Sequence, residues 1–154
     1  MDAFAEIAAV AASESPLWAA ALRSSEEGEP DPVFSTLAPA RFGLGLETIY
    51  EAYLVHYGRP RLFAPGQESE RVLLGDYLYA HGLVRVSDAG GVEAVAAMAE
   101  LISRCASLRA AGEDGDGDAW VTAARALGGE PSGDEIATAL HRHEALVGTG
   151  TIPQ

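Results

Sequence analysis

The chain has 154 residues, of which 48% are hydrophobic, so it is the size of one globular domain with a real core. Its 10 basic residues are all arginine, and 23 acidic residues give a formal net charge of −13. This balance argues against nucleic-acid binding, because neutralising phosphates requires lysine or arginine gathered on one face.

The N-terminal segment indicates no targeting to a membrane or to the secretory route. It lacks the positively charged start of a signal peptide, and Glu6 and Glu14 interrupt its apolar run. No stretch reaches the roughly 20 apolar residues of a transmembrane helix. The single cysteine, Cys105, cannot form an internal disulfide. We therefore expect a cytoplasmic protein without a transmembrane segment.

The first part of the chain, residues 1–45, is predicted to hold two helices and a long loop. Alanine-rich residues 2–12 place apolar side chains on one face, which favours a helix. Ser15 and Pro16 then suit the cap and first turn of a second helix that continues through Arg23. The acidic residues 24–32 are turn-rich and predict a loop.

The core helices are expected between residues 46 and 111. An amphipathic helix is predicted up to Tyr57, with Gly58 ending it. Its spaced apolar residues are Leu46, Ile49, Tyr50, Tyr53, Leu54 and Tyr57. From residue 70 to residue 111 the pattern predicts two apolar helices joined by a tight turn at 88–91, packed as an antiparallel hairpin.

The C-terminal helices are predicted within residues 112–147, followed by a frayed tail at 148–154. The glycine-rich acidic segment 112–118 predicts a loop whose last residue, Asp118, caps the next helix. Alternating aspartates there resemble the start of a calcium-binding loop, but Ala119 replaces the turn glycine and Arg125 replaces the bidentate glutamate. The sequence thus predicts a single all-α domain, a bundle of six or seven helices with no metal site.

Two short runs carry a family resemblance. The run Val72–Ala80 (VLLGDYLYA), preceded by the run Tyr57–Pro60 (YGRP), resembles the middle of a trans-polyprenyl diphosphate synthase. The similarity extends from Ile49 to Arg109, well under half of a complete catalytic chain. It implies that the domain is a fragment of the isoprenoid-synthase fold.

The same resemblance implies that the chain is not catalytic by itself. Complete members hold Mg²⁺ with carboxylates from two aspartate-rich helices. Here the first of these positions, residues 50–57, offers one carboxylate, Glu51, and a histidine, His56. The lysine-containing motif for the second substrate has no counterpart. We therefore assign no catalytic residue, metal or cofactor.

Six residues are candidates for a ligand or interface site: Arg59, Arg61, Gly75, Asp76, Tyr77 and Tyr79. The two arginines would contact a diphosphate, since guanidinium groups suit phosphate oxygens, or would pair at the surface with Glu68 and Glu70. Asp76 lies in an apolar stretch, which predicts a buried carboxylate held by a neighbouring helix, or else a polar group facing a pocket. The tyrosines would be core or interface aromatics.

Two functions are compatible with these features. The first is an accessory or regulatory subunit of a prenyl diphosphate synthase in isoprenoid biosynthesis, whose face from Gly75 to Tyr79 packs on the catalytic subunit. The second is a homodimeric helical module, in which a second copy of the chain is the partner and an isoprenoid or other lipid is bound without turnover.

Overall fold

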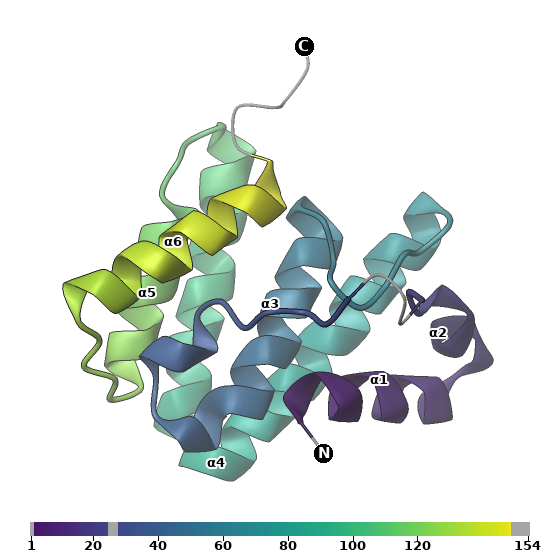
Figure 1. Cartoon of the computed structure of the whole chain (residues 1–154), viewed down its shortest axis with the longest axis horizontal. Coiled ribbons are helices and arrows are strands. Elements are labelled where there is room, and N and C mark those ends of the chain that lie inside the picture. The colour runs from purple at the N-terminus through teal and green to yellow at the C-terminus, as the bar shows by residue number, and fades with distance from the viewer. Residues whose placement is uncertain (1, 25–27, 149–154) are drawn as a thin grey trace.

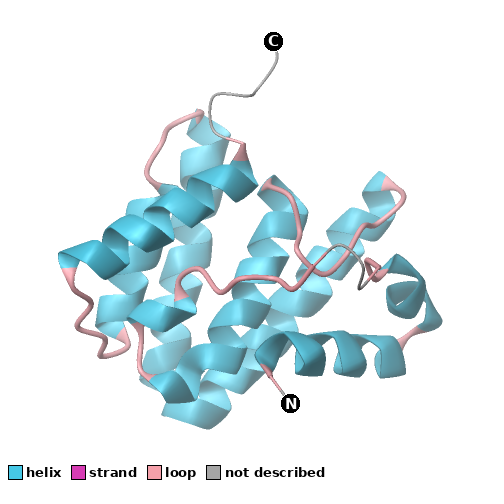
Figure 2. Ribbon diagram, in the orientation of Figure 1, coloured by secondary structure: helices cyan, strands magenta, loops and turns pink. Residues whose placement is uncertain are grey.

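The computed structural model describes residues 2–24 and 28–148, and this part of the chain is helical without β-strands (Figures 1 and 2). Its α-helices are α1 (Ala3–Glu14), α2 (Pro16–Ala21), α3 (Gly43–Tyr57), α4 (Glu68–Ala111), α5 (Asp116–Ala126) and α6 (Gly133–Val147). Two short 3₁₀ turns, Ser35–Leu37 and Ala40–Phe42, precede α3. The predicted all-α fold is confirmed. None of the helices in the described ranges has the length and apolar character needed to span a bilayer.

Helix α4 changes direction at a single residue. Gly91 has a φ of 76° and a ψ of −161°, a conformation that residues with a Cβ rarely adopt. Figure 1 shows the chain running down along residues 68–90, the first arm, and up again along residues 92–111, the second arm, so that the two arms form a V. The predicted tight turn at 88–91 is thus one glycine. The arms spread apart instead of packing as an antiparallel hairpin because α3 packs against both of them.

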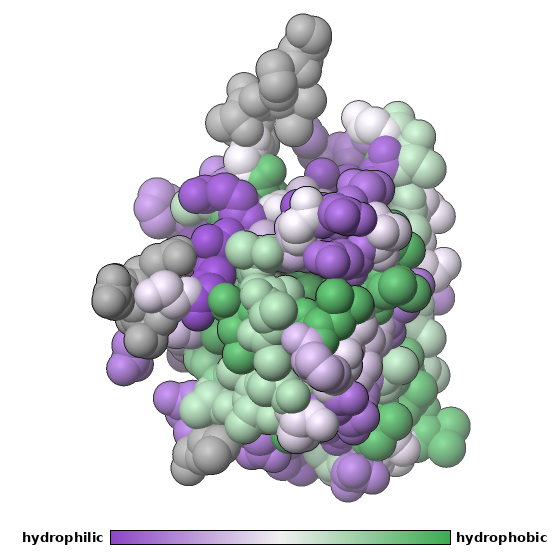
Figure 3. Space-filling model, turned by 90° about the vertical axis from the view of Figure 1, so that its right-hand side faces the viewer, coloured by the Kyte–Doolittle hydropathy of each residue, from purple (hydrophilic) through white to green (hydrophobic). Residues whose placement is uncertain are grey.

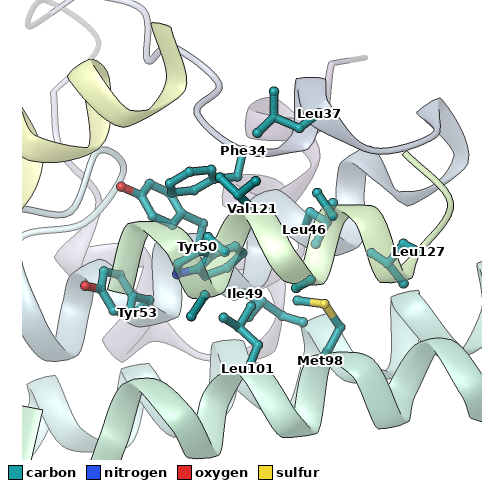
Figure 4. Packing of buried hydrophobic residues seen from close by; sticks show 14 of the residues in the cluster. Phe34, Leu37, Leu46, Ile49, Tyr50, Tyr53, Met98, Leu101, Val121 and Leu127 are labelled. Atoms are coloured by element: carbon teal, nitrogen blue, oxygen red, sulfur yellow. The ribbon is translucent and has the colours of Figure 1, made fainter. Parts of the chain in front are cut away.

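Helix α3 lies at the centre of the bundle. All of residues 45–55 are buried, so the predicted one-sided amphipathic helix is wrong. Its side chains meet both arms of α4. Val55 belongs to a hydrophobic cluster with Leu74 and Leu78 of the first arm, and Ile49 to a cluster with residues of the second arm. Figure 4 shows Ile49 beside Met98 and Leu101. A fully surrounded helix has to satisfy every polar group it carries.

The remaining predicted elements are close to those in the structure. Ser15 caps α2, and Pro16 occupies its first turn, as the sequence predicts. Helix α5 begins at Asp116, earlier than predicted, and Asp118 lies inside its first turn. Ser132 and Glu135 form a reciprocal capping box at the start of α6. Residues 25–27 of the predicted loop and 149–154 of the predicted tail lie outside the described residues.

Candidate functional site

A buried cluster of three charged side chains fixes the loop after α3. Glu47 and Glu51 are four residues apart, so both project from the same side of the helix. The chain then turns at Gly58, and this turn places the Arg61 guanidinium between the two carboxylates. Arg61 lies 2.6 Å from a Glu47 carboxylate oxygen and 3.1 Å from a Glu51 carboxylate oxygen. The three side chains are 5% (Arg61), 3% (Glu47) and 0% (Glu51) exposed.

Backbone groups complete this cluster. The amide of Leu62 donates to Glu51 at 2.8 Å, and the amide of Val33 donates to Glu47 at 3.3 Å. Burial lowers the pKa of Arg61, but the two carboxylates outweigh burial and raise its pKa above the ordinary value. The predicted pairing of Arg61 with Glu68 and Glu70 is therefore wrong, because the guanidinium is enclosed by the acids of α3.

A pocket of about 390 Å³ opens beside this cluster, and we call it the arginine pocket. Its lining includes four of the ten arginines of the chain: Arg23, Arg59, Arg61 and Arg142. Arg23 follows α2, Arg59 and Arg61 lie in the loop after α3, and Arg142 lies on α6. Two acidic residues, Glu29 and Asp31, also line the pocket. The fold thus gathers basic side chains that are far apart in a strongly acidic sequence.

Arg59 and Arg142 are held in the arginine pocket by backbone carbonyls. Arg59 donates to the carbonyl of Ala145, and Arg142 donates to the carbonyl of Pro32 at 2.9 Å. In the part of the chain that the structure describes, no carboxylate oxygen lies within 4 Å of either guanidinium. Each group keeps its positive charge and most of its five N–H donors for another acceptor.

A second polar cluster joins the second arm of α4 to α5. Arg109 donates to a carboxylate oxygen of Asp116 at 2.8 Å and to the Tyr53 hydroxyl at 2.9 Å, and that hydroxyl donates to the same carboxylate oxygen. The other Asp116 oxygen is buried without a hydrogen-bond partner among the described residues. Asp116 therefore faces the protein interior. This orientation does not fit the calcium-binding loop that the aspartates of residues 113–118 resemble in sequence.

His143 lies next to this cluster and shares a 2.7 Å hydrogen bond with the Tyr50 hydroxyl. It is 4% exposed and packs among the aromatic rings of Phe34, Tyr50 and Tyr53. Burial lowers the pKa of His143 to about 4, although the nearby charge of Asp116 acts in the opposite direction. The imidazole is neutral at pH 7, which suits a packing role. No three His, Cys, Asp or Glu side chains come together as a metal site within residues 2–24 and 28–148.

Three of the predicted interface residues on α4 contact other side chains of the same chain. A Cβ on Gly75 would lie 2.3 Å from Nε2 of His56, so this glycine makes room for the imidazole. Tyr79 stacks on the same imidazole with ring centroids 5.2 Å apart. Tyr77 packs on Trp18 with centroids 5.8 Å apart. Gly75 is buried, whereas Tyr77 and Tyr79 are partly exposed and make these packing contacts with the rest of their rings.

Asp76 faces solvent. Its side chain is 68% exposed and lies 3.6 Å from Nε2 of His56. The prediction of a buried carboxylate is wrong, because the first arm has one open side although its sequence is apolar on several faces. Sequence reasoning also missed Glu47 and Arg142. The spacing of Glu47 and Glu51 was a visible signal, whereas nothing in the sequence connects Arg142 to Arg59.

The chain matches no protein-family model, no curated protein and no solved structure.

Proposed function

We propose that the chain is a non-catalytic accessory subunit of a prenyl diphosphate synthase, and that its arginine pocket holds the diphosphate of an isoprenoid. The observation that carries this proposal is the pair Arg59 and Arg142, two guanidinium groups without carboxylate partners among the described residues, lining one pocket of a chain with a net charge of −13. Guanidinium groups bind phosphate oxygens through paired N–H donors. Elsewhere the acidic surface would repel such an anion.

The cluster of Glu47, Glu51 and Arg61 supports the non-catalytic part of the proposal. Magnesium-dependent ionisation of a diphosphate requires carboxylates that are open to the metal. The two carboxylates of α3 are buried, and the Arg61 guanidinium lies between them. The single guanidinium occupies both carboxylates and offsets one of their two charges, so neither carboxylate is open to a metal ion. The chain would hold a substrate or product while a catalytic partner supplies the metal and the reacting groups.

Geranyl diphosphate is expected to bind the purified chain without added metal, and Arg59→Gln and Arg142→Gln are each expected to weaken binding about tenfold. Removing one charge-assisted contact to a phosphate typically costs roughly 1.5–3 kcal/mol, which is tenfold or more. Isothermal titration calorimetry measures the dissociation constants. Arg125→Gln is the matched control, since Arg125 is exposed on α5 outside the pocket. If the wild type and the three variants bind geranyl diphosphate with equal affinity, the arginine pocket is not the diphosphate site.

The subunit role is tested separately, by co-expression with a full-length prenyl diphosphate synthase from the same genome. We expect a complex on size exclusion and a changed product chain length compared with the synthase alone. If the chain elutes alone and the products are unchanged, the subunit role is rejected, whatever the result of the calorimetry.

The homodimeric lipid-binding module has less support. A lipid chain requires an apolar cavity, whereas charged side chains line both the arginine pocket and a second pocket beside Asp116. The centre of the bundle is filled by aromatic rings from α3, α5 and the segment before α3 (Figure 4). The homodimeric module stays a prediction, and sedimentation of the purified chain would test it by showing whether a stable dimer forms.

A further inference from the structure

Hydrophobic side chains are exposed along the first arm of α4. Of the five large hydrophobic residues that are exposed in the described ranges, four lie on α4: Val72 (42%), Leu73 (57%), Val84 (59%) and Val92 (84%). Helix α4 forms the far side of the molecule in Figure 1, and the right-hand edge of Figure 3, which shows that side, carries hydrophobic residues.

Five exposed residues in the middle of the first arm share one side of the helix. They are Val72, Leu73, Asp76, Ala80 and Val84, which we call the outer stripe. The other exposed residues, Glu68, Ser69, Ser87, Asp88 and Gly90, lie at the two ends of the arm. Steps of three and four residues separate most of them, so they lie above one another along the helix. The opposite side of the same arm supplies Leu74, Leu78 and Val86 to the core. The outer stripe is therefore not packed by the fold itself, and exposed large hydrophobic residues gathered on one side of a helix are typical of an interaction site.

The charge of the outer stripe indicates what kind of partner it fits. Asp76 is its only charged residue, and its carboxylate is 68% exposed. The nearest histidine, His56, has its Nε2 3.6 Å from this carboxylate, and burial lowers the pKa of that imidazole. A second copy of the chain would bring another Asp76 and another net charge of −13 to the same surface. Like charges of this size oppose self-association, whereas a basic side chain would be attracted.

We propose that the outer stripe binds an amphipathic helix of the catalytic partner, with apolar side chains against Leu73, Ala80 and Val84 and one basic side chain at Asp76. This inference rests on the proposed function for the identity of the partner. Ala80 allows a close approach of the two helices, Leu73 and Val84 supply the apolar contact, and Asp76 fixes the register. A single polar residue in an apolar helical interface commonly has this last role.

The test compares variants in binding to the co-expressed prenyl diphosphate synthase, measured by surface plasmon resonance. Leu73→Glu combined with Val84→Glu is expected to weaken binding at least about thirtyfold, the effect of losing a central interface contact. Asp76→Lys is expected to weaken it about tenfold, while Asp76→Glu should stay near wild type. Leu17→Glu is the control, because Leu17 is also an exposed hydrophobic residue but lies on α2. Circular dichroism and geranyl diphosphate titration check that each variant is folded.

The outcomes separate this inference from the proposed function. If all variants bind the synthase as the wild type does, the outer stripe is not the docking surface, and the subunit role stands. If no variant and no wild-type protein binds, while Leu73→Glu with Val84→Glu converts a dimer of the chain to a monomer, a second copy covers the outer stripe. That result would overturn both the inference and the subunit role.

Discussion

Replacing Arg61 by methionine is expected to lower the free energy of unfolding by about 3–5 kcal/mol, the usual cost of removing one partner from a buried ion pair. Glu47 and Glu51 are 3% and 0% exposed, and they would be left as two uncompensated carboxylates four residues apart. Urea unfolding followed by circular dichroism measures the change. The variant Arg125→Met removes an exposed arginine and is expected to change stability by less than about 0.5 kcal/mol.

Neutralising Glu47 and Glu51 as well separates the two causes of this loss of stability, which are the unpaired charges and the lost packing of the arginine side chain. A triple variant with Arg61→Met, Glu47→Gln and Glu51→Gln keeps the shapes of the two acidic side chains and removes all three charges. It should be more stable than Arg61→Met alone, because the unpaired charges and not the lost arginine stem carry most of the cost. A loss of under about 1 kcal/mol for Arg61→Met would mean that the loop relaxes and water reaches the two carboxylates.

Stability is expected to decrease by about 3 kcal/mol between pH 6.5 and pH 4 through His143 alone. The pKa of His143 is lowered to about 4 in the folded protein from an ordinary value of 6.5. Between these values the unfolded chain binds a proton that the folded chain does not, so unfolding is favoured as the pH falls. The contribution is complete above pH 6.5 and is lost progressively down to pH 4. Each pKa unit corresponds to 1.36 kcal/mol.

The measurement is urea unfolding of wild type and His143→Gln at several pH values. Acidic groups affect both proteins, so the informative quantity is the difference between them. His143→Gln should be less stable at pH 7, because it loses the fit among Phe34, Tyr50 and Tyr53, and the difference should shrink as the pH falls. His141→Gln, on the exposed side of the same helix, should follow the wild type. A difference that stays constant from pH 7 to pH 4.5 would contradict a buried neutral histidine.

The candidate site could be predicted only in part, because the sequence shows residue types but not which of them meet. Their chemistry makes Arg59 and Arg61 candidates for a diphosphate contact, and the fold places both at the arginine pocket. The fold gives the two arginines different roles. Arg61 forms buried ion pairs with Glu47 and Glu51, whereas Arg59 has no carboxylate partner in the described ranges. Arg142 joins Arg59 from a helix more than 80 residues away, a distance over which no local pattern carries information.

The sequence by itself determined the local structure. Alanine-rich and apolar periodicity favours helices, Ser15 with Pro16 and Ser132 with Glu135 begin two of them, and glycines end or bend the chain. These are effects of neighbouring residues, so they can be read without the fold. The sequence also established the acidic surface and the absence of lysine.

Only the tertiary structure decided which sides of the helices are covered. An apolar helix such as α4 can turn any of its faces inward, and packing against α3 selected Leu74, Gly75 and Leu78 and left Leu73 and Asp76 outside. In the same way the position of α3 between the two arms buried Glu47 and Glu51 and required Arg61 to meet them. Burial and charge pairing depend on contacts between distant segments, and these contacts decide where this chain can bind a ligand or a partner.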